Sequence, residues 1–318
     1  MSGARSPLPQ LEPGFFLTDG GLETVLVFQQ GLELNAFAAF PLLETADGRD
    51  RLRAYYGAFL QTAAELGAGF VLETPTWRAN PDWAAVLGYD RSQTERVNRD
   101  AVAFMTELRD LAASPRPVLV SGCIGPRGDG YRIDAAMAAD EAEAYHSFQV
   151  GVFSDAGADL VTALTIGYAE EAIGIARAAH AANIPAVISF TVETDGMLPS
   201  GHPLGASIQA VDDATGGIPA YYMVNCAHPT HLAGALGSDG PWRSRIRGLR
   251  SNASMLSHAE LDEATELDDG DPDDLAARYV QMRTALPELS VLGGCCGTDH
   301  RHVEAIGRAW LADSRAAD

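Results

Sequence analysis

The sequence contains no lysine, so all 22 of its basic residues are arginines. This absence excludes mechanisms that need a primary amine on a side chain: a Schiff-base lysine, a lysine bound to pyridoxal phosphate, or the lysine of a Walker A phosphate loop. The arginines are outnumbered by 43 acidic residues, which give the chain a formal net charge of −21. Because nucleic-acid binding requires a basic face, this charge argues against a nucleic-acid partner.

Long hydrophobic runs and cysteines are scarce as well. No stretch of about 18 apolar residues is present, so we expect no membrane-spanning helix. Residues 1–14 contain no apolar segment of the kind that forms a signal peptide. Four cysteines in a chain of 318 residues do not make a disulfide scaffold. A reducing cytoplasm is the simplest location that fits these absences.

What the sequence does contain is a series of short, almost continuously apolar segments, which are typical of strands buried on both faces. The expected strands are residues 15–17, 69–72, 118–120, 160–163, 186–190, 221–224, 246–249 and 291–292. Helical patterns fill most of the gaps, at residues 51–66, 92–112, 138–156 and 169–182. Asp271 and Asp299 are placed to cap the starts of two more helices.

Eight strands that alternate with helices predict an α/β fold, a single closed (β/α)8 TIM barrel, which reaches this chain length. The alternative is an open doubly wound sheet, whose nucleotide-binding form has G-x-G-x-x-G after the first strand. Here that segment is TDGGLET, which does not match. We therefore expect one barrel over residues 15–312, with an N-terminal extension at 1–14 and a C-terminal tail at 313–318.

Residues that can do chemistry follow several of the predicted strands. They are Asp19 and Gly20 after the first strand, Glu73 after the second, Asn225 and Cys226 after the sixth, and the segment GGCCGT, residues 293–298, after the eighth. In a barrel the carboxyl ends of the strands converge on one rim, where the active sites of this fold lie. We therefore expect these residues to share one site.

The adjacent cysteines of GGCCGT have three interpretations: a redox pair, part of a metal site, or small buried thiols. Cys226 would reach the same rim as Cys295 and Cys296. Three thiolates can supply three corners of a tetrahedral zinc site and leave the fourth open. The three cysteines form no C-x-x-C array, however, so from spacing alone buried thiols are the simpler interpretation.

Several segments together resemble the homocysteine S-methyltransferase family. They are TDGGLET, ETPTW, SGCIGP, VNCAHP and GGCCGT, and the similarity extends from about residue 15 to residue 312. The resemblance implies a zinc-dependent barrel that methylates a thiol, with Cys226, Cys295 and Cys296 as the ligands of Zn2+. Cys123 lies in the third-strand segment, outside this set, and is expected to be a packed thiol.

The resemblance also leads us to expect a substrate-binding set of Asp19, Gly20, Glu73, Thr165 and Asn225. Asp19 matches the aspartate of the family's first-strand motif, which lies at the substrate site, and Thr165 matches a threonine after the fourth strand. The other three have structural alternatives. Gly20 can serve backbone geometry, Glu73 can orient neighbouring loops, and Asn225 can brace the cysteine loop.

Two positions depart from the family pattern. Leu164 stands where the fourth strand commonly has the glutamate that holds the amino group of homocysteine, and a leucine cannot pair with an ammonium group. After the seventh strand, RSNAS keeps the asparagine of the family's Tyr-Pro-Asn and loses the aromatic and the proline. Both changes leave the identity of the thiol acceptor open.

The function that the resemblance favours is methyl transfer from S-methylmethionine to homocysteine, giving methionine. S-methylmethionine is the expected donor because no second module that would carry cobalamin or folate is present. Trp77 and Phe28, together with the carboxylates of Asp19 and Glu73, are candidates for a wall around such a cationic donor. The alternatives are the same zinc barrel acting on a different thiol, and a thiol- or metal-binding protein without catalysis.

Overall fold

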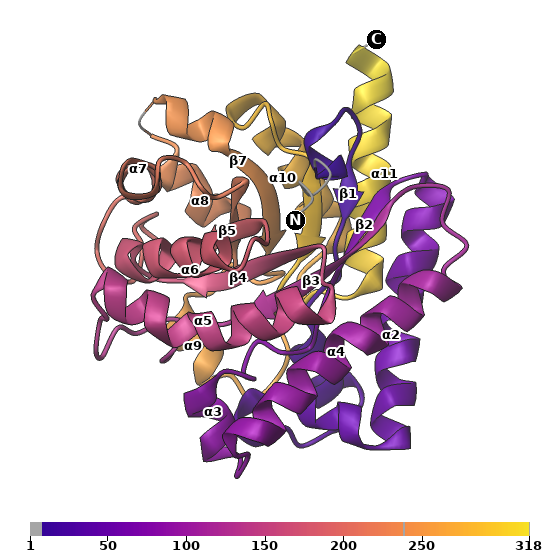
Figure 1. Cartoon of the computed structure of the whole chain (residues 1–318). Helices are drawn as coiled ribbons and strands as arrows, with labels where there is room; N and C mark the ends of the chain where they lie inside the picture. Colours follow the sequence, from indigo (N-terminus) through magenta and orange to yellow (C-terminus); the bar gives the residue numbers. More distant parts are fainter. Residues whose placement is uncertain (1–7, 238, 318) are drawn as a thin grey trace.

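Eight parallel strands pair in chain order, and β8 pairs back with β1 to close a barrel (Figure 1). The structure is a computed structural model and describes residues 8–237 and 239–317. The strands are Phe16–Leu17 (β1), Gly69–Glu73 (β2), Val118–Ile124 (β3), Leu160–Ile166 (β4), Ala186–Phe190 (β5), Tyr221–Asn225 (β6), Ile246–Ser251 (β7) and Val291–Gly294 (β8). The predicted TIM barrel is confirmed, because pairing of the first strand with the last excludes an open sheet.

Helices surround the barrel, and the last of them, α11, packs beside α2 to cover the seam where the barrel closes (Figure 1). The α-helices are Leu22–Thr24 (α1), Ala46–Leu66 (α2), Pro81–Val86 (α3), Arg91–Leu111 (α4), Ala139–Ala156 (α5), Ala169–Ala181 (α6), Leu204–Thr215 (α7), Pro229–Ala235 (α8), His258–Asp262 (α9), Pro272–Ala285 (α10) and His300–Ala317 (α11). Short 3-10 helices lie at Pro9–Leu11 (η1), Asn35–Phe37 (η3), Phe40–Glu44 (η4) and Pro241–Arg245 (η5), and a π-helix lies at Val25–Gln29 (η2).

The predicted helix starts are confirmed by their capping contacts. The side chain of Asp271 accepts hydrogen bonds from the backbone N–H groups of Asp273 and Asp274, and that of Asp299 accepts one from the N–H of Arg301. Both contacts satisfy donors that the first turn of a helix leaves free. The division of the chain into extension, barrel and tail stays a prediction.

Inside the barrel, the floor is apolar. Every strand except β7 contributes one or two side chains to it: Phe16, Val71, Leu119, Leu160, Val187, Tyr221, Met223 and Val291. The N-terminal segment closes this floor from below, where Leu8 packs against it and Gln10 donates a hydrogen bond to the Tyr221 hydroxyl. A second and larger apolar core lies between the strands and the helices.

Above the floor, the inward side chains become polar. Successive side chains of a strand alternate between its two faces, so the residue two positions beyond a floor residue also points inward. This rule places polar groups in one layer near the rim: Glu73 above Val71, Ser121 above Leu119, Thr162 above Leu160, Ser189 above Val187 and Asn225 above Met223. The change from apolar floor to polar rim positions the site.

Several predicted strands ended too early, and their boundaries were wrong. Strand β3 continues to Ile124, β4 to Ile166 and β7 to Ser251. The polar and glycine residues at these ends had indicated loops, but in a closed barrel their backbone groups still pair with neighbouring strands. Cys123 and Leu164 therefore lie within strands; Cys123 pairs with Thr162, whereas Leu164 lies where the pairing of β4 with β5 shifts register.

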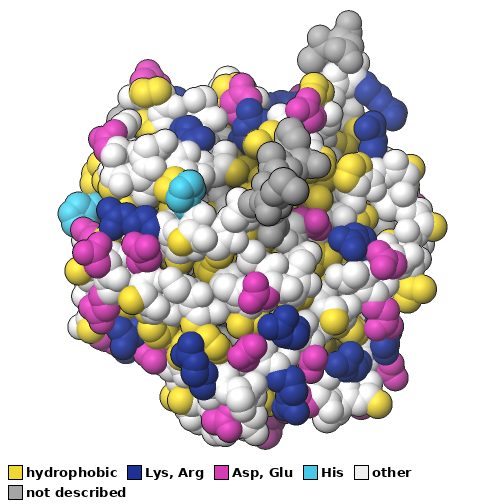
Figure 2. Space-filling view, in the orientation of Figure 1, with side chains coloured by type: hydrophobic (Ala, Val, Ile, Leu, Met, Phe, Trp, Pro, Cys, Tyr) yellow, Lys and Arg dark blue, Asp and Glu magenta, His cyan; other side chains and the backbone are white. Residues whose placement is uncertain are grey.

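The outer surface mixes charges of both signs. Figure 2 shows one face, on which arginines and acidic side chains are interspersed. Over the described residues, many charged side chains form exposed ion pairs, such as Arg51 with Asp47 and Arg308 with Glu304. In the part of the chain that the structure describes, no helix is long and apolar enough to span a bilayer.

Candidate functional site

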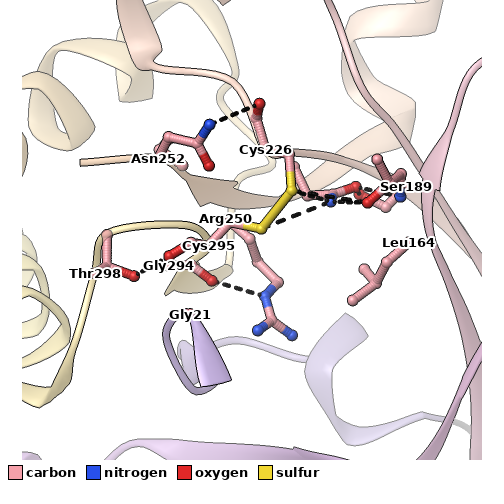
Figure 3. The surroundings of a disulfide bond; sticks show 12 residues. Gly21, Leu164, Ser189, Cys226, Arg250, Asn252, Gly294, Cys295 and Thr298 are labelled. Atoms are coloured by element: carbon pink, nitrogen blue, oxygen red, sulfur yellow. Dashed lines mark hydrogen bonds between the residues drawn. A yellow bond between two sulfur atoms is a disulfide. The ribbon is translucent and has the colours of Figure 1, made fainter. Parts of the chain in front are cut away.

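Three cysteines meet at the rim of the barrel. The sulfur atoms of Cys226, Cys295 and Cys296 all lie within 4.8 Å of one another, and we call these residues the cysteine cluster. Cys226 and Cys295 are joined as a disulfide, while Cys296 is free (Figure 3). The adjacent pair Cys295 and Cys296 is therefore not bonded to itself. Cys123 is a separate buried thiol, as expected.

Backbone contacts hold the cysteine cluster in place. The N–H of Cys226 donates to the carbonyl of Arg250 at 3.1 Å, and that of Cys295 donates to the carbonyl of Ser251 at 2.8 Å. Cys226 also has a φ of 55°, the left-handed region that non-glycine residues rarely adopt. The bend at the end of β6 turns this side chain toward the loop after β8. The disulfide joins the two loops.

Glycines let the first and last loops interlock beside the cysteine cluster. A Cβ added at Gly20 would lie 2.7 Å from the carbonyl oxygen of Thr298, and one added at Gly21 would lie 2.5 Å from that of Cys295. Both positions accept only a residue without a side chain unless the backbone moves. These contacts confirm a role in backbone geometry for Gly20, whether or not it also binds substrate.

Asn225 braces the cluster from within the barrel. Its Oδ1 accepts hydrogen bonds from the N–H of Thr165 at 2.8 Å and the hydroxyl of Ser189 at 2.7 Å. Its Nδ2 donates to the Thr165 hydroxyl at 2.8 Å and to the sulfur of Cys226 at 3.2 Å. Thr165 itself has a φ of 63°. The amide thus ties the ends of three strands to one cysteine, which agrees with the bracing role.

A second group of side chains, which we call the charged cluster, lies next to the cysteines and consists of Asp19, Glu73 and Arg250. Arg250 Nη2 is 2.7 Å from Asp19 Oδ1, and both side chains are almost completely buried. The hydroxyl of Tyr55 donates to the other oxygen of Asp19 at 3.1 Å. Both oxygens of this carboxylate therefore have protein partners.

Burial and mutual charge set the protonation of this cluster. Burial opposes the charge of Arg250, but Asp19 and Glu73 outweigh it and hold the pKa of the guanidinium above its usual value. Burial raises the pKa of Glu73 to about 7, although the positive charge of Arg250 acts in the other direction. Glu23 lies close by, and burial raises its pKa to about 7 as well. Arginine remains cationic while two of the carboxyl groups titrate near neutral pH.

The two clusters line one narrow cavity, the inner pocket, of about 70 Å3. It contains every expected site residue: Asp19, Gly20, Glu73, Thr165, Asn225, Cys226, Cys295 and Cys296. Leu164 also lines it and is 8 % exposed. The structure thus brings together residues from strands at opposite ends of the chain. Their roles as metal ligands and substrate contacts stay predictions.

An outer chamber of about 360 Å3 adjoins the inner pocket, and Trp77, Tyr131 and Cys296 line both. Phe28 and Phe37 add two aromatic rings to its wall. Trp77 and Phe28, two of the candidates for a donor wall, thus lie at the chamber. The other two, Asp19 and Glu73, are in the inner pocket instead.

Sequence reasoning missed Arg250. For the segment RSNAS, we considered the aromatic residue and the proline that it lacks, but not the arginine that it contains. The strand alternation gives a signal that was available: Gly248 faces inward against Met223, so Arg250, two positions on, must face inward too. A buried arginine requires an acidic partner, and Asp19 is the carboxylate at the same rim.

The sequence model of the family described as Homocysteine S-methyltransferase matches residues 16–310. A homocysteine S-methyltransferase from Zea mays, number 4, is 26% identical over 93% of this chain and 89% of its own length. The homocysteine S-methyltransferase of Escherichia coli strain K12 is 31% identical over 41% of this chain and 46% of its own.

Solved structures of the homocysteine methyltransferase MmuM from Escherichia coli share the fold. The oxidized form superposes with a TM-score of 0.74 at 21% identity. The superposition covers 93% of this chain and 96% of the solved one. The metallated form gives a TM-score of 0.71 at 20% identity with the same coverage. At this level of identity the likeness supports the barrel architecture.

Proposed function

The chain belongs to the homocysteine S-methyltransferase family, and from that premise we propose that it is a zinc-dependent enzyme that transfers a methyl group from S-methylmethionine to homocysteine, giving methionine. The observation that carries the proposal is the cysteine cluster at the mouth of the inner pocket. Three sulfur ligands in a narrow pocket that opens to a chamber of about 360 Å3 suit a site that binds and activates a thiol.

The cysteine cluster fits a zinc ion. Zinc–sulfur bonds of 2.3 Å in a tetrahedron place two sulfurs about 3.8 Å apart. The sulfur atoms of Cys226, Cys295 and Cys296 already lie within 4.8 Å of one another, so small side-chain rotations suffice. The disulfide between the first two must be reduced, because thiolates are the ligands. A cytoplasmic setting, as proposed from the composition, would keep them reduced.

Bound zinc would lower the pKa of an acceptor thiol in the fourth position and hold it as a thiolate at neutral pH. The protein supplies the rest. Asn225 donates a hydrogen bond to the sulfur of Cys226 and so stabilises negative charge on the cluster. Glu23, with a pKa of about 7, can accept the proton that the thiol loses.

The transfer itself is a direct displacement. The acceptor sulfur forms a bond to the methyl carbon while the bond from that carbon to the donor sulfonium breaks. The electron pair of the broken bond stays on the donor sulfur, which leaves as a neutral thioether. With S-methylmethionine as donor and homocysteine as acceptor, both products are methionine and one proton is released.

The outer chamber is the proposed donor site. A sulfonium cation is attracted to aromatic faces, and Phe28, Phe37, Trp77 and Tyr131 line the chamber. Its wall also carries the carboxylates of Asp129, Glu266 and Asp268, which outnumber the guanidinium of Arg78 that lies over the Trp77 ring. Cys296 lies at the junction with the inner pocket, so a methyl group held there would face the acceptor sulfur. Both products are neutral at the reacting sulfur and lose this attraction.

The test is methyl transfer by reduced, zinc-loaded protein. We expect methionine to form from S-methylmethionine and homocysteine, to disappear after chelation, and to return when zinc is added back. No transfer to homocysteine from this donor, with one zinc bound per chain, would contradict the proposed reaction.

One observation favours a second acceptor. Leu164 places an apolar side chain in the inner pocket, where an ammonium group would need a carboxylate. The same zinc barrel would then act on a thiol without a free amine.

A further inference from the structure

Arg250 lines the inner pocket, and the proposed reaction gives it no role. It is 4 % exposed and extends from the end of β7 to the loop after β1. Its Nε donates to the carbonyl of Gly294 at 3.1 Å, and its Nη2 donates to Asp19 at 2.7 Å and to the carbonyl of Gly20 at 3.3 Å. Its three partners therefore belong to the loop after β1 and to the end of β8, which build the site.

The remaining nitrogen of the guanidinium, Nη1, has no hydrogen-bond partner among the described residues. Buried N–H groups are nearly always paired, and an unpaired one on a cation is especially costly. Because Arg250 lines the inner pocket, a molecule bound there can supply the missing acceptor. Figure 3 shows the guanidinium turned into the space between the Gly21 loop and Leu164, below the bonded sulfurs.

Arg250 is a direct neighbour of the cysteine cluster. The backbone carbonyl of Arg250 accepts from the N–H of Cys226, and its side chain is bonded to Gly294, the residue before Cys295. A thiol held at the cysteine cluster would need only a few carbon atoms to bring an anionic group to Nη1. The N–H groups of Nη1 can donate to a carboxylate oxygen, and such a charge-assisted hydrogen bond is stronger than one to a neutral acceptor.

The same pocket offers little to an ammonium group. Asp19 is neutralised by Arg250 and also accepts from Tyr55. Leu164 is apolar. Glu73 has one oxygen without a partner, and Glu23 also lines the pocket; burial raises the pKa of each carboxyl group to about 7, so both are only partly ionised at neutral pH. The ion pair of Asp19 and Arg250 is neutral as a whole, and the group that it leaves for an incoming molecule is the unpaired Nη1 of Arg250.

We propose that Arg250 binds the carboxylate of the thiol acceptor through Nη1 and that the pocket makes no specific contact with an α-amino group. The acceptor class is then a short mercapto carboxylate, with or without an amine. Homocysteine belongs to this class, so the inference rests on the proposed function and extends it. Arg250 acts by placing the acceptor and takes no part in bond making.

The experiment compares three acceptors of equal chain length, with S-methylmethionine as donor and the full, reduced, zinc-loaded chain. They are homocysteine, 4-mercaptobutanoate, which lacks the amine, and 4-mercaptobutanamide, which lacks both the amine and the negative charge. We expect kcat/KM for the first two to agree within about threefold. The amide should be about 30-fold poorer, mainly through KM, as loss of a charge-assisted hydrogen bond predicts. Equal use of the amide and the carboxylate would overturn the inference.

Variants of Arg250 test whether this residue causes the preference for the carboxylate acceptor over the amide. Arg250→Lys keeps the charge beside Asp19 but loses the planar guanidinium, in which Nη1 stays free while Nη2 holds Asp19. The ratio of kcat/KM for 4-mercaptobutanoate over 4-mercaptobutanamide should therefore fall about tenfold. The double variant Arg250→Met with Asp19→Asn removes both members of the ion pair, which avoids leaving one buried charge alone, and should abolish the ratio. Bound zinc and the thermal midpoint report whether each variant is folded. A ratio unchanged in a folded variant would overturn the role of Arg250.

A preference for homocysteine over 4-mercaptobutanoate of more than about tenfold would show that the amine is bound after all. Loss of that preference in Glu73→Gln would identify Glu73 as the group that binds the amine. Each of these two results would overturn the proposal that the pocket makes no specific contact with an α-amino group.

If no acceptor is methylated, the proposed function fails, and binding still decides the inference. Calorimetric titration of zinc-loaded protein with 4-mercaptobutanoate needs no donor. Binding that Arg250→Lys weakens about tenfold supports the carboxylate site, whereas equal binding to both proteins overturns it.

Discussion

The cysteine cluster and the charged cluster share one pocket, yet they are built in different ways. Backbone hydrogen bonds and close glycine contacts position Cys226 and Cys295. By contrast, Asp19 and Arg250 are joined mainly through their side chains, across 231 positions of sequence. A structure held by the backbone depends on short local motifs, whereas one held by side chains depends on which residues the fold brings together. The cysteine cluster can therefore stay the same while substitutions in the charged cluster change which ligand the pocket binds.

The largest expected effect breaks the cysteine cluster. Replacing Cys226, Cys295 or Cys296 by serine should remove bound zinc and abolish methyl transfer, because a hydroxyl is a poor ligand for zinc at neutral pH. Zinc per chain and methionine formation are the two measurements. Cys123→Ser is the matched control, since this thiol lies outside the cluster, and it should keep its zinc. Full zinc content in all three cluster variants would disprove the ligand set.

The next effect concerns the interlocked loops. Gly20→Ala places a methyl group 2.7 Å from the carbonyl oxygen of Thr298, so the loop must move. We expect the free energy of unfolding to fall by about 1–3 kcal/mol and zinc affinity to fall with it. Gly57→Ala is the control, because that glycine lies in α2 with nothing near its added Cβ and should become slightly more stable. Similar denaturation curves for the two variants would contradict the interlock.

A third change tests the apolar side of the pocket. Leu164→Glu introduces a carboxylate where homocysteine would bring its amine, so the ratio of kcat/KM for homocysteine over 4-mercaptobutanoate should rise about tenfold. Leu164→Gln has nearly the same shape without the charge and should leave the ratio close to that of the native protein. No gain with the glutamate would show that the amine does not approach this position.

The smallest effect is a pH dependence in the charged cluster. The pKa of Glu73 is raised to about 7 from the ordinary value of 4.5, so the folded state holds this proton more tightly than the unfolded chain. The resulting stability is present in full below about pH 4.5 and is lost as the pH rises through about 7. The Glu73→Gln variant has no carboxyl group at this position, so this loss of stability does not occur in it. Urea unfolding at pH 5 and pH 8 should show the variant gaining on the native protein at the higher pH, and parallel pH curves would refute the shift.

Much of this molecule could be predicted from its sequence. The parts that could not be predicted were missed for one common reason. Apolar runs and their spacing predicted the barrel, and the motif GGCCGT with Cys226 predicted the cysteine cluster, because both depend on local patterns. The ends of β3, β4 and β7 and the role of Arg250 were missed. Each depends on a partner that is distant in sequence: a neighbouring strand in one case, and Asp19 in the other.

The contact between β1 and β8 has a consequence for the order in which the protein is made. Cys226 leaves the ribosome about 70 residues before its two partners, and β1 waits for nearly the whole chain before its second neighbour exists. The loop after β8 completes the cysteine cluster and also packs against Gly20 and Gly21. Closing the barrel and completing the cysteine cluster are thus one event, so a newly made chain has no complete cluster until its last strand is in place.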